Sequence, residues 1–452
     1  MVMGRRQDKQ PELFVATHNL PKSPGHPFYD KLNSLLAEAG FDRYVEDLCR
    51  PYYDEVWGRP SIPPGVYFRM LFVGYFEGVA SQRGIAWRCS DSRSLQGFLG
   101  YLPTEATPDH SSLTNTHQRL PEVVHENVFA LILKLAEDKG LLIGKTVGVD
   151  ASTLEANAAM KSLRRRDTGE DYQAFLKKLA HEAGLENPSA EDLRRFDKKR
   201  KDKTTSNEDW VAPADPEAQI TKMKDGTTHL AYKAEHVVDL ATELVLAAEI
   251  HPATAADSAT LAASVLTAEV NLARAGSEAV IEDVTTDKGY HKMETLAELA
   301  EADYRTYIPE PDGVYEHTWT DKPEGQERGY RNNRRRVRGA RGKRLQKLRS
   351  EKVERSFAHV CETGGARRSW LRGLVQVSKR YLMQVVAHNL GIVMRHVFGV
   401  GTPRSLQGAC GAGLALWSLW TGVWQALALH IRLKGSAKNA WFPHQVGLTA
   451  MA

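Results

Sequence analysis

The sequence predicts an α/β protein in which an α-helical N-terminal domain precedes a mixed-sheet core, and a charged helical insertion interrupts that core. Apolar residues recur at helical spacing up to residue 99, whereas short apolar runs typical of buried strands begin at residue 146. Between these runs lies a stretch that is rich in charge and poor in aromatic residues. We therefore expect a helical domain at 1–140, a mixed-sheet core at 141–400 with the insertion at 154–219, and a variable tail at 401–452.

The N-terminal domain should consist of short amphipathic helices. Helical patterns cover residues 28–36, 66–79, 81–88 and 95–99. The last two are separated by Ser90, Asp91 and Ser92, which gives the outline of a helix-turn-helix. Two interpretations of the arginines around this turn stay open. They either face solvent on a plain helical bundle or contact DNA.

The core should alternate strands and helices from residue 146 onwards. Strands are expected at residues 146–150, 229–238, 243–251, 279–285 and 304–309, and helices at 257–274, 292–300 and across residue 354. The second and third strands should form a hairpin, because only a short polar turn separates them. Such an alternation is typical of a sheet covered by helices.

Charge is sorted along the chain rather than large in total. The net charge of the 452 residues is only +4, but residues 328–349 hold eleven basic residues and no acidic ones. This run either binds a polyanion or is a solvated, disordered loop. The four cysteines lie far apart without zinc-binding spacing, and the N-terminus has no secretory signal. We expect a cytoplasmic, nucleoid-associated protein.

The apolar stretch at residues 409–430 raises the question of a membrane span. It carries three tryptophans and several glycines. A packed or protruding C-terminal helix is favoured over a span, and no membrane partner is expected.

Three carboxylates form the candidate catalytic set. Asp150 ends the first strand and Asp287 follows another, so both meet at one sheet edge if the strands are neighbours. Glu354 lies on a helix whose apolar stripe would pin it against the sheet. Carboxylate oxygens are the ligands that Mg²⁺ prefers. In a chain with 56 acidic residues, spacing alone is weak support for this set.

Several separated motifs give the chain a resemblance to a known family. It resembles the DDE transposases of bacterial insertion sequences, whose catalytic core is RNase H-like, over approximately residues 1–405. The matching stretches are GHPFY (25–29), YFRM (67–70), PDHS (108–111), GVD (148–150), KMKDG (222–226), DKGYH (287–291) and VERSF (353–357). Around the catalytic Glu the chain departs from many relatives, since Ser350 and Cys361 stand where Arg and Lys are common.

The resemblance implies a catalytic triad of Asp150, Asp287 and Glu354 that holds two Mg²⁺ ions, with Mn²⁺ able to substitute. It implies metal-dependent cleavage of the element's terminal inverted repeats and strand transfer into target DNA by a homodimer on paired ends. Arginines in and after the basic run would bind DNA phosphates: Arg334, Arg335, Arg336, Arg338, Arg349, Arg367 and Arg368. Trp370 is expected in the core, with stacking on a flipped base as the alternative.

Two other functions stay open at this point. A decayed or domesticated copy would bind DNA without catalysis, and a stand-alone nuclease of the same fold would cut without joining. Magnesium-dependent nicking separates the first from an active enzyme. The large helical N-terminal domain favours end recognition over simple nuclease action.

Overall fold

The computed structural model describes residues 16, 20, 25–54, 56–200, 206–223, 226–313, 318–320, 322, 323 and 325–406. The described residues up to Gly401 belong to one compact unit. The predicted helix at 409–430 and nearly all of the predicted tail lie outside the described residues. In the part of the chain that is described, no helix is both long and apolar enough to cross a membrane.

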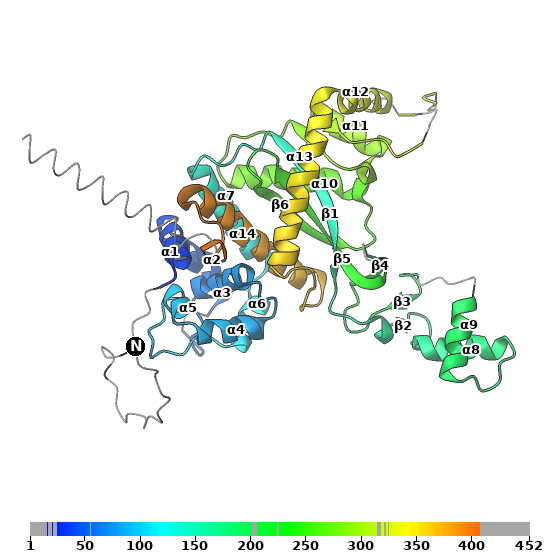
Figure 1. Ribbon diagram of the computed structural model, residues 1–452, viewed down its shortest axis with the longest axis horizontal. Helices are drawn as coiled ribbons and strands as arrows, with labels where there is room; N and C mark the ends of the chain where they lie inside the picture. The colour runs from blue at the N-terminus through cyan, green and yellow to red at the C-terminus, as the bar shows by residue number, and fades with distance from the viewer. Residues whose placement is uncertain are drawn as a thin grey trace, which may run out of the picture. The chain divides into compact units, whose positions relative to one another are not determined.

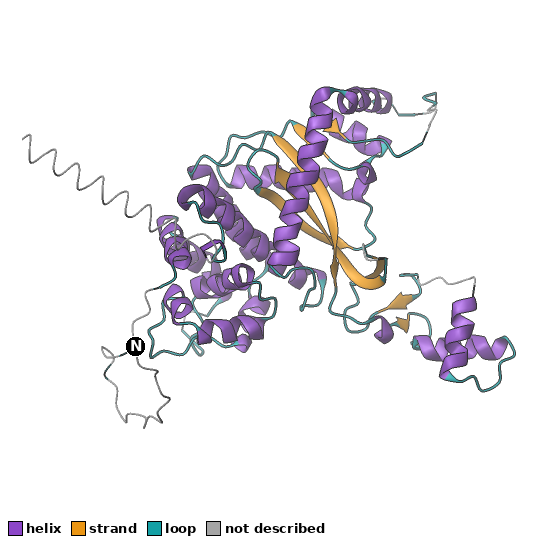
Figure 2. Cartoon of the chain, viewed as in Figure 1, coloured by secondary structure: helices purple, strands orange, loops and turns teal. Residues whose placement is uncertain are grey.

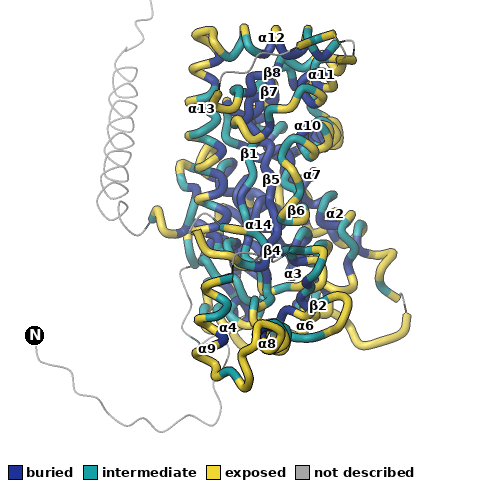
Figure 3. The backbone as a smooth tube through the Cα atoms, turned by 90° about the vertical axis from the view of Figure 1, so that its right-hand side faces the viewer, coloured by how far each residue is buried: buried dark blue, intermediate teal, exposed yellow. Residues whose placement is uncertain are grey.

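The chain begins with short helices that enclose an apolar core, as the sequence predicts. They are α1 (Pro27–Glu38), α2 (Phe41–Cys49), η2 (Arg50–Tyr52), α3 (Pro64–Glu77), α4 (Gln82–Asp91), α5 (Arg93–Phe98), α6 (His110–Arg119) and α7 (Glu122–Asp138). Helix α3 is almost entirely buried at the centre of this group (Figure 3). Ser81, Ser92 and Asp109 cap the first-turn amides of α4, α5 and α6, which fixes where these helices begin. Two helices follow each other here as predicted, but α4 continues through Ser90 and Asp91, so the break between α4 and α5 is Ser92 alone.

A mixed sheet forms the core (Figure 2). In the described chain its strands are β1 (Thr146–Glu155), β4 (Gln219–Lys222), β5 (Thr228–Asp239), β6 (Val245–Pro252), β7 (Asp283–Thr285) and β8 (Arg305–Tyr307). Antiparallel β5 flanks β1 on one edge, and parallel β7 and β8 follow on the other. The predicted hairpin of β5 and β6 is confirmed. This order agrees with the expected RNase H-like core.

Helices cover both faces of the sheet (Figure 1). They are α10 (Asp257–Arg274), α11 (Met293–Glu301), α12 (Gln326–Arg338), α13 (Ala340–Phe357) and α14 (Leu374–Phe398), with the single turn η4 (Lys288–Tyr290) after β7 and the π-helical turn η5 (Ala358–Thr363) after α13. Helix α13 packs on β1 and β5, whereas α10 packs on β5 and β6. Helix α14 packs against α3 and α7, so the last described helix joins the N-terminal helices.

The charged insertion folds as a small unit with its own core. It contains η3 (Met160–Ser162), β2 (Arg164–Arg165), α8 (Tyr172–Glu182), α9 (Ala190–Lys199) and β3 (Trp210–Val211). Leu176, Ala180 and Leu193 form its buried centre, with Tyr172 and Phe196 packed against them. Helix α9 begins at a capping box in which Ser189 and Asp192 bind each other's backbone amides.

Three predicted strands differ clearly in length from those in the structure. The strand predicted at 304–309 is only Arg305–Tyr307. The first strand continues to Glu155 instead of ending at Asp150, because β5 pairs with it along its whole length. The strand predicted at 279–285 is only Asp283–Thr285, because the amides of Glu282 and Asp283 both bond to the carbonyl of Lys145. The basic run is neither a loop nor one helix, since Gly339 separates α12 from α13.

Candidate active site

The pairing of β1 with β7 brings Asp150 and Asp287 to the same level of the sheet. The parallel ladder joins Thr146 to Asp283 and ends with Gly148 opposite Thr285. Asp150 and Asp287 each lie two residues beyond that last pair. Asp287 is held in place as the cap of η4, since its Oδ1 accepts a hydrogen bond from the Gly289 amide at 2.9 Å. The prediction that the strands leading to Asp150 and Asp287 are neighbours is confirmed, because β1 pairs directly with β7.

Asp150 faces helix α13. It stands opposite His236 of β5, whose ring bonds to Ser356 Oγ on α13 at 2.8 Å. Arg349 of the same helix donates from Nη1 to Asp150 Oδ2 at 2.7 Å, and both side chains are largely shielded from solvent. The helix lies very close to the strand here, because a Cβ added at Gly148 would be only 2.8 Å from Val353 Cγ2. Glycine at 148 thus allows the contact between α13 and β1.

Glu354 lies on α13 directly after Val353, which is fully buried against the strand. Its side chain is exposed, and its Oε1 accepts a hydrogen bond from Ser350 Oγ at 3.0 Å. The structure thus places Glu354 on the helix that covers Asp150. The carboxylate oxygens of the three predicted residues do not all lie within 4.8 Å of one another. Among the described residues, the three potential metal ligands that lie this close together are Glu235, Glu249 and His251.

A fourth carboxylate, Asp257 at the start of α10, adjoins Asp287. A Cβ at Gly289 would lie 3.1 Å from both Asp257 Oδ2 and Asp287 Oδ1, so glycine leaves a space between the two acids. Lys233 Nζ pairs with Asp257 Oδ1 at 3.0 Å. Sequence reasoning missed Asp257, because an acidic residue in a first helical turn is ordinary helix chemistry.

Tyr290 lies within the electrostatic influence of three acidic residues around the site. Burial raises the pKa of Tyr290 well above its ordinary value, and the charges of Glu235, Asp257 and Asp150 raise it further. Its hydroxyl donates to Glu235 Oε2 at 2.9 Å. The negative charges of these three carboxylates therefore all favour the neutral, protonated form of the Tyr290 hydroxyl.

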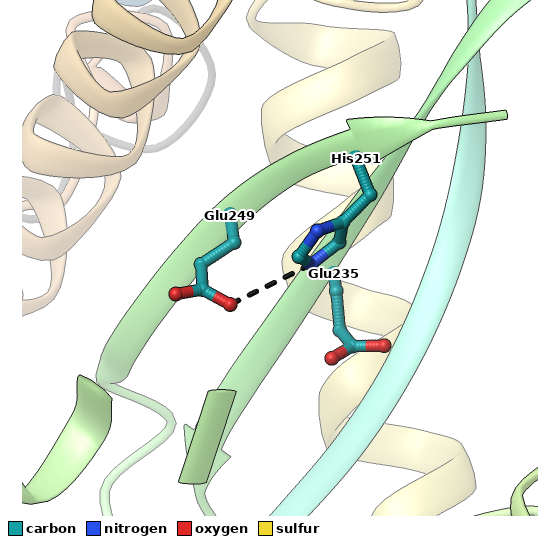
Figure 4. Close-up of side chains that lie close together, drawn as sticks. All are labelled: Glu235, Glu249 and His251. Carbon is teal, nitrogen blue, oxygen red and sulfur yellow. Dashed lines mark ion pairs between the residues drawn. The ribbon is translucent and has the colours of Figure 1, made fainter. Parts of the chain in front are cut away.

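Buried Glu235 also belongs to a polar cluster with the partly exposed Glu249 and His251 on β5 and β6 (Figure 4). The Ser264 hydroxyl lies 2.5 Å from Glu235 Oε1 and 2.6 Å from Glu249 Oε2, and His251 pairs with Glu249 at 3.5 Å. Burial raises the pKa of Glu249, but hydrogen bonds from His251, Ser264 and Thr267 outweigh it and lower the pKa. Hydroxyl groups of α10 are therefore hydrogen-bonded to the carboxylates of Glu235 and Glu249. Charged residues at alternate positions of two adjacent strands were the sequence signal for this cluster.

The predicted DNA-binding arginines of α12 divide into exposed and internally bonded side chains. Arg335 and Arg338 are exposed. Arg334 pairs with Glu310 at 3.1 Å, and Arg336 donates to the carbonyl of Thr306 at 3.0 Å. Burial lowers the pKa of Arg336. Because α12 is a helix, some of its arginines point toward β8 and are bonded within the protein. A count of basic residues along the sequence does not distinguish these arginines from the exposed ones.

The two remaining predicted arginines lie beyond α13. Arg367 donates to Ser152 Oγ at 3.0 Å and to the Thr153 carbonyl at 2.9 Å, so it is tied to the strand of Asp150. Arg368 is half exposed and stacks over Trp370 at 5.4 Å from the ring centre. Trp370 itself is 53% exposed, so its expected place in the core is wrong.

The donor set suits a divalent metal. Asp150 and Asp287 offer the hard carboxylate oxygens that Mg²⁺ and Mn²⁺ prefer, and Glu354 adds a third from α13. The space that Gly289 leaves beside Asp287 would be filled by any Cβ, which is consistent with room being kept next to this carboxylate. The residues therefore fit the metal ions that the resemblance implies.

Two protein families match this chain. Residues 17–119 match the transposase domain family DUF772, and residues 196–390 match the transposase DDE domain. The second match contains Asp287 and Glu354, whereas Asp150 lies between the two matched regions. No curated protein and no solved structure matches the chain. The two matches together cover more than half of the chain, and the order of the strands agrees with an RNase H-like core. The chain therefore belongs to the DDE transposases of bacterial insertion sequences.

Proposed function

We propose that this DNA transposase cleaves DNA at the ends of its insertion sequence and joins the freed ends to target DNA, using Asp150, Asp287 and Glu354. The observation that carries the proposal is the register of β1 and β7, which sets Asp150 and Asp287 at equal distances beyond their last paired residues. Helix α13 crosses the same strand and carries Glu354.

The three carboxylates would hold two Mg²⁺ ions, or Mn²⁺ in their place. When bound, such ions lower the pKa of an attacking water and stabilise negative charge on the leaving oxygen. The chain's own part is to fix geometry. Val353 and Gly148 hold α13 against the strand, while η4 holds Asp287 by its cap.

Two phosphoryl-transfer steps use the same site. In the first, a water oxygen attacks the phosphodiester at the element's end, the P–O3′ bond breaks, and the departing 3′ oxygen takes up a proton. In the second, that 3′-hydroxyl attacks a target phosphodiester, whose own P–O3′ bond breaks in exchange. Neither step needs an oxidant or an energy source, because one phosphodiester replaces another in the joining step.

DNA binding would use the exposed arginines of α12 and the arginines after α13. Phosphate contacts by Arg335 and Arg338 would add affinity that falls with salt. Arg349 now pairs with Asp150 and would exchange this carboxylate for DNA phosphate when metal binds. Because both element ends must be held together, we infer a homodimer on paired ends.

The test uses labelled DNA that carries the element's terminal inverted repeat, with Mg²⁺ or with EDTA. The wild type is compared with Asp150→Asn, Asp287→Asn and Glu354→Gln. Each substitution should lower the cleavage rate by about a hundredfold or more, which corresponds to about 3 kcal/mol of lost transition-state stabilisation. Binding of the uncleaved DNA should persist, since these side chains carry no positive charge.

Glu351→Gln is the matched control, because Glu351 lies on the same helix one turn away and pairs only at the surface with Arg355. It should cleave at the wild-type rate. Binding without cleavage by the wild type would indicate a decayed copy, and cleavage without joined products would indicate a nuclease. Undiminished cleavage by the Asp150 variant would refute the assigned site.

A further inference from the structure

A pocket apart from the three carboxylates lies where the first turn of α4 meets residues 365–371 and helix α14. Its volume is about 420 Å³, which is within the range of small-molecule pockets. Its charged and titratable lining consists of Arg83, Arg368, Arg380 and His110, with Tyr381 on α14. No aspartate or glutamate lines it in the described chain. The composition points to a negatively charged ligand.

Arg380 is the strongest feature of this pocket. Its side chain is only 9% exposed, and its Nη1 is buried without a hydrogen-bond partner among the described residues. Nη2 makes a long hydrogen bond of 3.4 Å to the carbonyl of Ala80. Burial lowers the pKa of Arg380 to about 10. A buried guanidinium without a carboxylate partner is costly to the fold, so its presence at this position calls for another explanation.

The other groups around Arg380 favour an anion as well. Ala80, Ser81, Gln82 and Arg83 bring the N-terminal turn of the ten-residue helix α4 to the pocket wall. The first amides of a helix have no acceptor within the helix and attract phosphate. Arg368 stacks over the exposed ring of Trp370, which also lines the pocket.

We propose that this pocket binds a backbone phosphate of the DNA substrate, with Arg380 as the buried ligand and Arg83 and Arg368 at the rim. The volume leaves space for the attached sugar or base beside Trp370 and Leu154. The inference rests on the DNA binding of the proposed function but not on cleavage. The pocket lies between an N-terminal helix and the end of β1, so a phosphate bound there contacts both parts of the transposase.

The experiment measures DNA binding by fluorescence anisotropy in EDTA over a range of salt concentrations. Arg380→Met and the double variant Arg83→Ala/Arg368→Ala are compared with Arg43→Ala, whose side chain is almost fully exposed on α2. We expect Arg380→Met to bind about tenfold more weakly and the slope of log affinity against log salt to fall by roughly one. The control should keep the wild-type slope. Arg380→Met should also be at least as resistant to heat as the wild type, because it removes an unpaired buried charge.

Inorganic phosphate and a deoxynucleoside monophosphate are tested separately by their effect on the melting temperature. Stabilisation of the wild type but not of Arg380→Met, together with the weaker DNA binding, supports the proposal. Phosphate binding with unchanged DNA affinity would assign the pocket to a free phosphate compound and overturn it. If Arg380→Met fails to fold, the surface double variant decides, and an unchanged salt slope there overturns the proposal. Failed cleavage with intact Arg380-dependent binding would refute only the catalytic assignment.

Discussion

Adding one methyl group at residue 148 should separate helix α13 from the strand of Asp150. In Gly148→Ala the new Cβ would lie 2.8 Å from Val353 Cγ2 and from Leu240 Cδ2, and 3.1 Å from Arg349 Cγ. Ordinary contacts begin at 3.4 Å, and both Leu240 and Val353 are buried, so we expect α13 to shift away from β1. Overpacking of this kind costs about 1–3 kcal/mol. The loss of chain entropy in the unfolded state offsets this by less than about 1 kcal/mol.

Urea unfolding should therefore show Gly148→Ala to be destabilised by about 1–2 kcal/mol. Cleavage should fall by about tenfold to a hundredfold, because a shift of α13 misplaces Glu354. Gly97→Ala is the matched control, since Gly97 lies in helix α5 with nothing within 4 Å of the added Cβ. That variant should be as stable as the wild type or slightly more stable. Wild-type stability and wild-type cleavage in Gly148→Ala would refute the close packing of α13 on β1.

Three further predictions concern other parts of the molecule. Arg349→Met should bind Mn²⁺ about fivefold more tightly without DNA, because it removes the cation paired with Asp150, and an unchanged Mn²⁺ titration would contradict the pairing. Burial lowers the pKa of His236 and of His388 to about 3. Since unfolded histidines protonate near pH 6.5, stability should be fully present above that pH and be lost as the pH falls toward 3. His388→Gln should flatten this profile in urea unfolding, and an equally steep profile would count against the neutral histidine. Leu176→Ala should cost about 2 kcal/mol within the insertion alone, so amide exchange should rise in α8 and α9 while the main unfolding transition stays unchanged.

Local sequence patterns predicted those helices and strands whose own residues determine where they begin and end. The helix expected at residues 257–274 has these bounds in the structure, since its alanine-rich pattern follows a strand and begins with an acidic residue. The first strand was predicted too short, because its second half (residues 151–155, ASTLE) has neither an apolar run nor a regular alternation and is defined by pairing with β5. Pairing with a distant segment leaves no local signal.

In the candidate site, too, local patterns predicted some residues, whereas others are brought there only by the tertiary fold. Asp150 and Asp287 could be predicted together because each follows an apolar strand pattern, and the parallel ladder puts those strands side by side. Asp257 could not, since only the fold brings the start of α10 to Gly289. Trp370 was misjudged because aromatic residues are usually buried, whereas here a loop exposes the ring beside Arg368.

Helix α14 connects the N-terminal helices to the strand opposite Asp150. On one side, Lys379 donates to the carbonyls of His117 and Leu120 at the end of α6. On the other, Tyr381 bonds at 2.8 Å to His236, which stacks on Phe357 of α13. Because these contacts are buried and directional, we expect a shift of the N-terminal helices to move α14 and α13 as well.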